Sequence, residues 1–417
     1  MRLLTRALLV CVASLLILPL PAAAQSDLNL GETRTSIVEV RQAGGLDPST
    51  LSLIDDAVRA VGAESTVLHR VTLRMLRITR GEEVVQEAPR GFGYPMLTMS
   101  LDPDSRIVPD DLRVSLSSGD AVMGEITARL RGARVGDVAH LEGLDGRVVA
   151  VRLGAIVPDQ DLRWSEIVIG TSFVPGLRID RPYSVVAWGT AGVPLAAAIR
   201  IWTTHPGVRV LDGSEEPATD LVLPIAMVKE QFGEFAVAAA EGDSVLVDRE
   251  WRDTWIVTVD FPIVGETRCH RMVVPYVRAA LVEVESSGLS AELDRADFQA
   301  AGGCFNPRFN RGADPGYSLS RHSWGIAVDF NPSSNRYGDV PTLSPEIVNI
   351  FRRWGFSWGG AWSVPDGMHF EWLSQPSNYP VACSDLTAIP RELSAPVDGD
   401  PGGSSSWMLL PFGGSCQ

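Results

Sequence analysis

Lysine is almost absent from this chain of 417 residues. Lys229 is the single example, and arginine supplies the other positive side chains. Together with abundant Ala, Gly and Val, this bias indicates a GC-rich coding sequence and carries no functional information. Positive charge as a whole is also scarce, because 36 basic residues stand against 51 acidic ones, a net charge of −15. Such a surface repels nucleic acid and anionic lipid, so we expect neither as a partner.

Long apolar runs are missing after the first 24 residues. Residues 1–6 contain Arg2 and Arg6 and no acidic residue, 7–18 are apolar apart from Ser14, and 22–24 are alanines. This order is typical of a secretory signal peptide, and the apolar run is too short to span a bilayer as a stable helix. We expect cleavage after Ala24 and an exported protein, secreted or held in the cell envelope, with no membrane span in its mature form. An uncleaved anchor is the alternative.

Cysteine is sparse as well. The chain contains five, and one of them, Cys11, lies in the expected signal peptide. The four that remain form an even set, which in an oxidising compartment predicts disulfides. We favour the pairs Cys269–Cys304 and Cys383–Cys416. Zinc ligation by cysteine would need a tight Cys-x-x-Cys spacing, which the sequence lacks.

Residues 25–262 are predicted to be a β-rich region of one or two subdomains. Short apolar or β-branched runs, such as Val71–Ile78, 196–202 and Trp255–Phe261, alternate with Gly, Asp and Pro turns, as strands do. One short helix is expected at Leu51–Val61. The sequence of this region does not predict a function.

Histidines of the N-terminal region stand apart from one another. His69, His140 and His205 have no acidic neighbours at a spacing that suits a metal. We therefore interpret each as a solvated or core histidine. His270, beside Cys269, is treated in the same way, because a lone histidine at the start of a helix is seldom a ligand.

The pattern changes near Cys269, where we place a domain at 263–384. Pro275–Glu285 carries apolar residues at helical spacing. A second helix is expected after Ser344, an N-cap residue that is followed directly by proline. Residues 385–417 are rich in Pro, Gly and Ser and are predicted to be a loose tail.

Two segments of this domain carry groups suited to catalysis. The first contains His322 and Asp329, seven residues apart, which would lie on opposite faces of an unbroken strand. For both to reach one metal the chain must bend, and Gly325 lies between them, where a bend costs least. The second segment contains Asp366, His369 and Glu371.

Two histidines and one carboxylate form a three-ligand zinc site that leaves a coordination position open for catalysis. Hydrolysis also needs a carboxylate to move protons, and Asp366 is our candidate. An arginine directed at the developing oxyanion would complete the site, with Arg308 as first choice and Arg311 as second. We expect Glu371 to support a ligand and not to be one.

The two segments together resemble a known family. Ser320-x-His-x-x-Gly-x-Ala-x-Asp329, followed by Trp358-Gly-Gly-x-Trp and Asp366-x-x-His-Phe-Glu371, is similar to the D-alanyl-D-alanine carboxypeptidase/L-alanyl-D-glutamate endopeptidase family of zinc peptidases. The resemblance covers about 269–384. It implies zinc bound by His322, Asp329 and His369, and Asp366 as general base.

The resemblance also implies a fold and a substrate. The fold is a small α+β domain with a central antiparallel sheet and flanking helices, shared with the signalling domain of hedgehog proteins. The substrate is a peptidoglycan stem peptide. Asp366, where the D,D-dipeptidases carry Glu, favours an L-alanyl-D-glutamate-type endopeptidase. The alternatives are a D,D-carboxypeptidase that removes terminal D-Ala, and an inactive zinc-bearing module that binds the cell wall. The sequence does not predict an oligomeric state.

Overall fold

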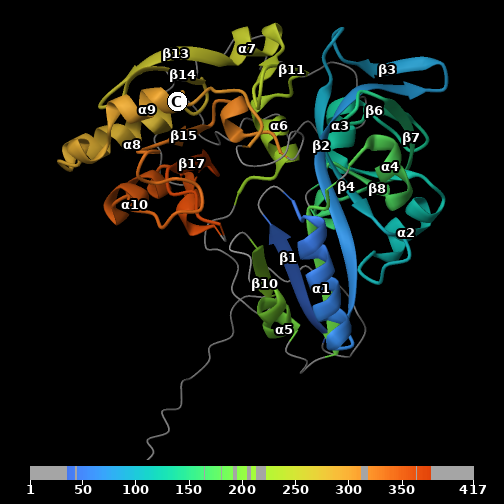
Figure 1. The fold of residues 1–417 in the computed structure, drawn as a ribbon. Helices are drawn as coiled ribbons and strands as arrows, with labels where there is room; N and C mark the ends of the chain where they lie inside the picture. Colours follow the sequence, from blue (N-terminus) through green and yellow to red (C-terminus); the bar gives the residue numbers. More distant parts are fainter. Residues whose placement is uncertain are drawn as a thin grey trace, which may run out of the picture.

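The computed structural model describes residues 35–376, with gaps at 43–44, 164, 180, 191–194, 204–207, 213–221, 311–317 and 363. The expected signal peptide, His205, Arg311, the pair Cys383–Cys416 and the tail 385–417 lie outside the described residues. The described chain is a mixed α/β structure (Figure 1). None of its described helices combines the length and hydrophobicity that crossing a membrane would need.

One ten-stranded sheet dominates the N-terminal region, which confirms that this region is β-rich. Its strands are β1 (Thr35–Gln42), β2 (Glu64–Arg80), β3 (Glu83–Glu87), β4 (Tyr94–Leu101), β5 (Ala121–Gly124), β6 (Val138–Glu142), β7 (Val148–Val157), β8 (Ile167–Gly170), β9 (Ser184–Thr190) and β10 (Val208–Asp212). Their order is β10-β1-β9-β2-β4-β8-β5-β7-β6, with β3 beside β2. A further β2–β6 pairing closes six strands into a ring, and the long strand β2 joins this ring to the β10-β1-β9 part.

Helices cover both parts of this sheet. They are α1 (Pro48–Ala60), α2 (Asp110–Ser117), α3 (Glu125–Arg131), α4 (Val174–Leu177) and α5 (Leu195–Trp202). Helix α1 confirms the expected short helix, and its N-cap Asp47 accepts hydrogen bonds from the backbone of Ser49 and Thr50. Helices α1 and α5 share one apolar core with β1 and β9.

The run 196–202, expected as a strand, is helix α5, so that prediction is wrong. Three consecutive alanines favour a helix, and Leu195, Ala196 and Ile199 form its buried face. That spacing fits a helix with one apolar stripe, which a short apolar run does not distinguish from a strand.

The C-terminal region alternates helices and short strands. Its elements are α6 (Ile225–Phe232), β11 (Val237–Ala239), β12 (Val245–Val247), α7 (Arg249–Trp255), β13 (Ile256–Phe261), β14 (Gly265–His270), α8 (Val274–Ser286), α9 (Arg295–Ala301), β15 (Ala327–Asp329), α10 (Pro345–Arg353), β16 (Phe356–Trp358) and β17 (His369–Trp372). Strand β17 lies between β15 and β16 in an antiparallel sheet, and β13 pairs with β14. Helices α8 and α10 confirm the two expected helices, and Ser344 is the N-cap of α10.

One apolar core unites these elements from Leu223 to Trp372, and it also includes Leu97 of β4 in the N-terminal region. It includes Phe232 of α6, which lies well upstream of residue 263. The expected division between 262 and 263 falls in the turn between β13 and β14. We therefore propose a division near residue 222 for any attempt to separate the two regions.

The single lysine lies buried where the two regions meet. The Nζ atom of Lys229 is 2.7 and 2.9 Å from the two carboxylate oxygens of Glu166 and 3.3 Å from Glu234, and it donates to the carbonyl of Pro95. Glu234 also pairs with the buried Arg131. Two cations and two carboxylates are thus buried together, so each charge has an opposite neighbour. Because Pro95, Arg131 and Glu166 belong to the N-terminal region, this network fixes α6 to it.

The other end of α6 is held by the C-terminal region. The carbonyl of Phe232 accepts hydrogen bonds from Trp251 Nε1 at 3.0 Å and from His270 Nε2 at 3.2 Å. The carbonyl of Gly233 accepts one from Trp324 Nε1 at 3.1 Å. These donors satisfy carbonyls that a helix end leaves free. Burial lowers the pKa of His270 to about 3, so this histidine is a neutral structural donor.

Candidate metal centre and active site

The chain bends between the first two candidate ligands at the expected position. Gly325 has a φ angle of +67°, and a Cβ atom there would lie 2.8 Å from the backbone nitrogen of His270. That nitrogen donates a hydrogen bond to the Gly325 carbonyl at 2.9 Å. After the bend, β15 pairs with β17 so that Asp329 lies opposite His369. The bend therefore turns His322 and Asp329 toward the same place.

His322, Asp329 and His369 come together as the sequence predicts. Asp329 Oδ1 lies 3.1 Å from His322 Nε2 and 3.0 Å from His369 Nδ1. One possible ligand atom from each of the three lies within 4.8 Å of the others, and all three residues are buried. Among the described residues, this is the group of His, Cys, Asp and Glu side chains that could hold a metal ion.

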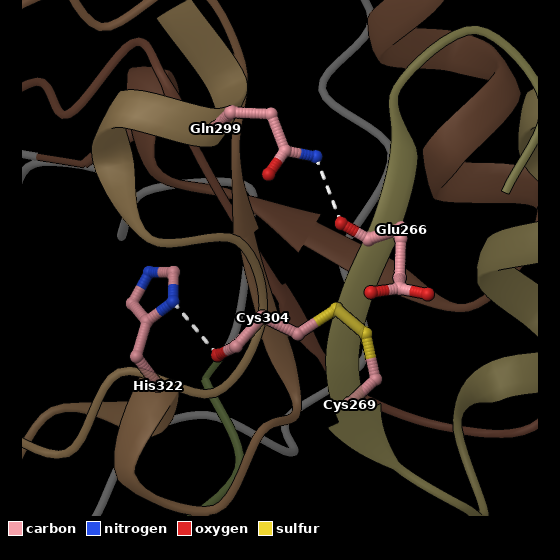
Figure 2. The surroundings of a disulfide bond; sticks show 5 residues. All are labelled: Glu266, Cys269, Gln299, Cys304 and His322. Carbon is pink, nitrogen blue, oxygen red and sulfur yellow. Dashed lines mark hydrogen bonds between the residues drawn. A yellow bond between two sulfur atoms is a disulfide. The ribbon is translucent and has the colours of Figure 1, made fainter. Parts of the chain in front are cut away.

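The orientation of His322 suits a metal ligand. Its Nδ1 lies 3.0 Å from the carbonyl oxygen of Cys304, which can only accept, so Nδ1 carries the proton (Figure 2). The opposite nitrogen, Nε2, is buried and has no hydrogen-bond partner among the described residues. Cys304 is held by the expected disulfide to Cys269, which is confirmed. The disulfide therefore supports the carbonyl that orients His322.

His369 is oriented by Glu371 on the same face of β17. The Glu371 carboxylate lies 3.1 Å from His369 Nε2, which leaves Nδ1 directed at Asp329. Burial alone would lower the pKa of His369, but the carboxylates of Asp329 and Glu371 raise it to about 10. Glu371 is also 3.5 Å from Arg321 Nε. Glu371 thus contacts the His369 nitrogen that does not face Asp329, and it supports a candidate ligand as expected.

Asp329 is kept ionised. Burial acts to raise the pKa of its carboxyl group, but the neighbouring His322 and His369 hold it well below its usual range. Two imidazole nitrogens and one carboxylate oxygen are the donor set of catalytic zinc sites. Since Nδ1 of His322 carries the proton, its buried Nε2 cannot donate to Asp329 Oδ1, 3.1 Å away, and the lone pair of Nε2 is available to such an ion. The residues therefore fit zinc.

Arg308 lies at this cluster. Its Nη2 is 3.5 Å from Asp329 Oδ2, and its Nη1 donates to the carbonyl of Asn306 at 3.2 Å. The backbone of Arg308 is fixed by Ser323, whose hydroxyl group accepts from Arg308 N and donates to Arg308 O, each at 3.1 Å. The first-choice arginine is thus beside the candidate metal centre, while Arg311 lies outside the described residues.

Asp366 has the properties of a proton acceptor. Its Oδ1 is buried and has no hydrogen-bond partner in the described part of the chain. Burial, above all, raises the pKa of Asp366 to about 6; the negative charges of Asp329 and Glu371 act in the same direction, while His369 and Arg308 oppose them. A carboxyl group with a pKa near neutrality can take a proton and release it again.

Sequence reasoning missed how Gly359 positions this carboxylate. The Gly359 carbonyl accepts from Asp366 N at 2.9 Å. A Cβ atom at residue 359 would lie 3.0 Å from Asp366 Cβ and 3.3 Å from His369 Cβ. Only glycine therefore fits between Asp366 and His369. The sequence signal for this role was Gly359 itself, in the Trp358-Gly-Gly motif. Trp358 holds the same loop, because its Nε1 donates to Gly367 O at 2.9 Å.

The comparison with protein families agrees with this geometry. Residues 313–372 match the model of a family described as D-alanyl-D-alanine carboxypeptidase. The match includes all three candidate ligands and Asp366, while Arg308 precedes it. No curated protein matches the chain. The C-terminal region is therefore confirmed, over residues 313–372, as similar to the D-alanyl-D-alanine carboxypeptidase family of zinc peptidases.

Proposed function

We propose that this protein is an exported zinc metallopeptidase that hydrolyses peptidoglycan stem peptides, cutting between L-Ala and D-Glu. The observation that supports it most is the convergence of two groups of side chains. His322, Asp329 and His369 form a buried donor set, and Asp366 lies beside them with a carboxylate oxygen that has no partner among the described residues. Export follows from the predicted signal peptide alone.

The residues of the chain divide the work of hydrolysis. Zinc, when held by His322, Asp329 and His369, would polarise the scissile carbonyl and make water a better nucleophile. Asp366 would take the proton of the attacking water and pass it to the leaving amine. Arg308 would offer positive charge to the oxygen that becomes negative.

A D,D-carboxypeptidase is the second candidate, and the description of the matching family favours it. Such an enzyme needs a cation that binds the terminal carboxylate of its substrate. Arg321, next to His322, and Arg336 are the candidates for this cation. Arg321 is engaged elsewhere, since its Nη2 donates to the Leu223 carbonyl at 2.5 Å and its Nε faces Glu371. This engagement supports the endopeptidase.

An inactive zinc-bearing module, comparable to the hedgehog signalling domain, is the candidate from another class. The small antiparallel sheet β15-β17-β16 with helices α8 and α10 beside it supports the proposed hedgehog-like fold. A buried carboxyl group with a raised pKa at residue 366 supports turnover, because a binding module has no use for a proton carrier.

Mass spectrometry of defined stem peptides tests the proposal. The zinc-loaded protein is incubated with a pentapeptide stem and with its C-terminal amide. Release of L-Ala from both peptides is expected. Release of D-Ala from the free acid alone would establish the carboxypeptidase instead. Intact peptides, with zinc bound at one ion per chain, would favour the binding module.

A further inference from the structure

Arg321 connects the two segments that carry the candidate ligands. Its backbone lies in the short helix η4 (Arg321–Ser323), directly before His322, while its side chain reaches Glu371 on strand β17. Arg321 Nε is 3.5 Å from Glu371 Oε1, and the two side chains are 14% and 5% exposed. Two opposite charges from separate segments thus meet in a buried place beside the candidate metal centre.

The two oxygens of the Glu371 carboxylate have different neighbours. Oε2 lies 3.1 Å from Nε2 of His369, whose Nδ1 is directed at Asp329. Oε1 faces Arg321 and makes no hydrogen bond among the described residues. A carboxylate that contacts a ligand histidine fixes the orientation of the imidazole ring. A group that holds the carboxylate in place therefore acts on the ring as well.

The guanidinium group of Arg321 is held on its other side. Its Nη2 donates a hydrogen bond to the carbonyl oxygen of Leu223 at 2.5 Å. Leu223 is 6% exposed and directly precedes Pro224, the N-cap residue of α6. A guanidinium group presents its N–H groups in a rigid plane, so a bond at Nη2 also fixes the direction of Nε. The segment before α6 therefore directs Arg321 at Glu371.

A contribution to stability alone does not explain this buried pair. The cost of removing two charges from water offsets most of their attraction, and apolar side chains of similar volume often stabilise such a place equally well. A carboxylate is useful at residue 371, because it orients a ligand histidine and strengthens it as a ligand. An arginine is useful at residue 321, because it compensates the buried charge of that carboxylate and keeps it in place.

We propose that Arg321 is a positioning residue of the metal centre: through its ion pair with Glu371, it holds the ring of His369 with Nδ1 toward Asp329 and so raises the affinity of the site for zinc. The identity of the metal rests on the proposed function. Loss of a group that supports a metal ligand weakens metal binding or activity by about 10–100-fold. Arg321 therefore contributes to metal affinity without contacting the ion.

Zinc affinity of the full chain, measured by competition with a chelating dye, tests this role. The proteins are wild type, Arg321→Gln, Glu371→Gln and the double variant. We expect Arg321→Gln to weaken zinc binding about tenfold and Glu371→Gln at least as much. The double variant should bind no more weakly than Glu371→Gln, because both side chains act through one pair. Arg321→Lys should recover part of the affinity, since it keeps the charge and loses the planar group.

Arg353→Gln is the matched control, because it removes an exposed arginine of α10 that pairs with Glu283. It should bind zinc as the wild type does. Equal zinc affinity of Arg321→Gln and Arg353→Gln overturns the proposal, and so do additive losses in the double variant, since Arg321 would then act without Glu371. If Arg321→Gln does not fold, the same cycle with Arg321→Lys decides.

The zinc measurements need no turnover, which separates this inference from the proposed function. Coupled losses of zinc affinity in a protein that leaves every stem peptide intact would support the positioning role and contradict the proposed peptidase. Conversely, unchanged zinc affinity in Arg321→Gln, with KM raised only for a peptide that has a free terminal carboxylate, would make Arg321 a substrate-binding residue. A wild-type chain that binds no zinc would overturn both proposals.

Discussion

Buried charge is arranged differently at the two centres of this molecule. Around Lys229, two cations and two carboxylates face one another, so each charge has an opposite neighbour, although Arg131 Nε makes no hydrogen bond among the described residues; Lys229 itself is only 1% exposed. Around Asp329, buried side chains also converge, but His322 Nε2 and Asp366 Oδ1 have no hydrogen-bond partners among the described residues. The first centre joins two regions, whereas the second leaves the lone pairs of two buried atoms without a hydrogen-bond donor.

This contrast separates buried charges that stabilise the fold from buried charges that are suited to catalysis. A buried ion that meets its counter-ion can be tolerated, because attraction offsets much of the cost of leaving water. Buried polar atoms without partners are expensive, and a protein keeps them where a ligand or a reaction needs them. The same property, burial of charge, thus indicates a structural role at Glu166 and a functional one at Asp366.

Substitution of a candidate ligand tests the functional centre most severely. His369→Ala should lose both zinc and hydrolysis, because two protein ligands do not retain a catalytic ion. Metal analysis by mass spectrometry and a peptide assay measure this. His69→Ala, which removes a half-buried histidine that contacts Ser100 in the N-terminal sheet, is the control and should keep both. One zinc per chain in His369→Ala would show the ligand assignment to be wrong.

Asp366→Asn should separate metal binding from proton transfer. The variant keeps its zinc, while kcat falls by about 10²–10⁴-fold, the usual contribution of a general base. Metal content and single-substrate kinetics check both parts. Activity near that of the wild type would remove Asp366 from the mechanism and direct attention to Glu371. Loss of zinc would make Asp366 a ligand.

Lys229→Met tests the structural centre. The change leaves Glu166 buried without its cation, and breaking such a pair costs about 3–5 kcal/mol in the free energy of unfolding. Urea unfolding measures this cost. Arg249→Ala breaks an exposed pair with Asp253 and should cost less than about 1 kcal/mol. Similar costs for the two variants would mean that the two ion pairs contribute alike and that the buried pair has no special structural role.

The pH dependence of hydrolysis gives the smallest effect. Burial is the main cause that raises the pKa of Asp366 to about 6, and only the ionised carboxylate accepts a proton. Activity should therefore be retained above pH 6 and fall about tenfold for each pH unit below it. Zinc content is measured at each pH, since acid also protonates ligands. A profile that stays flat down to pH 4 with zinc retained contradicts this role.

Local sequence signals predicted much of the candidate site. The bend at Gly325, the shared face of His369 and Glu371, and the N-cap Ser344 each depend on neighbours within a few residues. The Cys269–Cys304 pair, which the sequence favours, is present. The bend, the shared face and the N-cap follow from the short-range rules of turns, strands and helix ends, whereas the disulfide joins residues with a sequence separation of 35.

Features that depend on distant partners were not predictable in this way. The pairing of β2 with β6 closes the ring of six strands and joins residues that are far apart in the sequence. The sequence of neither strand predicts which strand it pairs with. The local sequence of helix α6 is apolar and does not predict the region in which the helix packs. Its Phe232 belongs to the core of the C-terminal region.

The burial of Lys229 also bears on the chemical labelling of this protein. Lysine supplies the amine with which acylating reagents and amine cross-linkers react, and this chain has one such side chain. In the native state Lys229 is shielded and bound to Glu166, so labelling should be confined to the amine at the start of the chain. Acylation of Lys229 would then report that α6 has moved away from Glu166. The reactivity of Lys229 toward acylating reagents therefore measures the separation of the two regions.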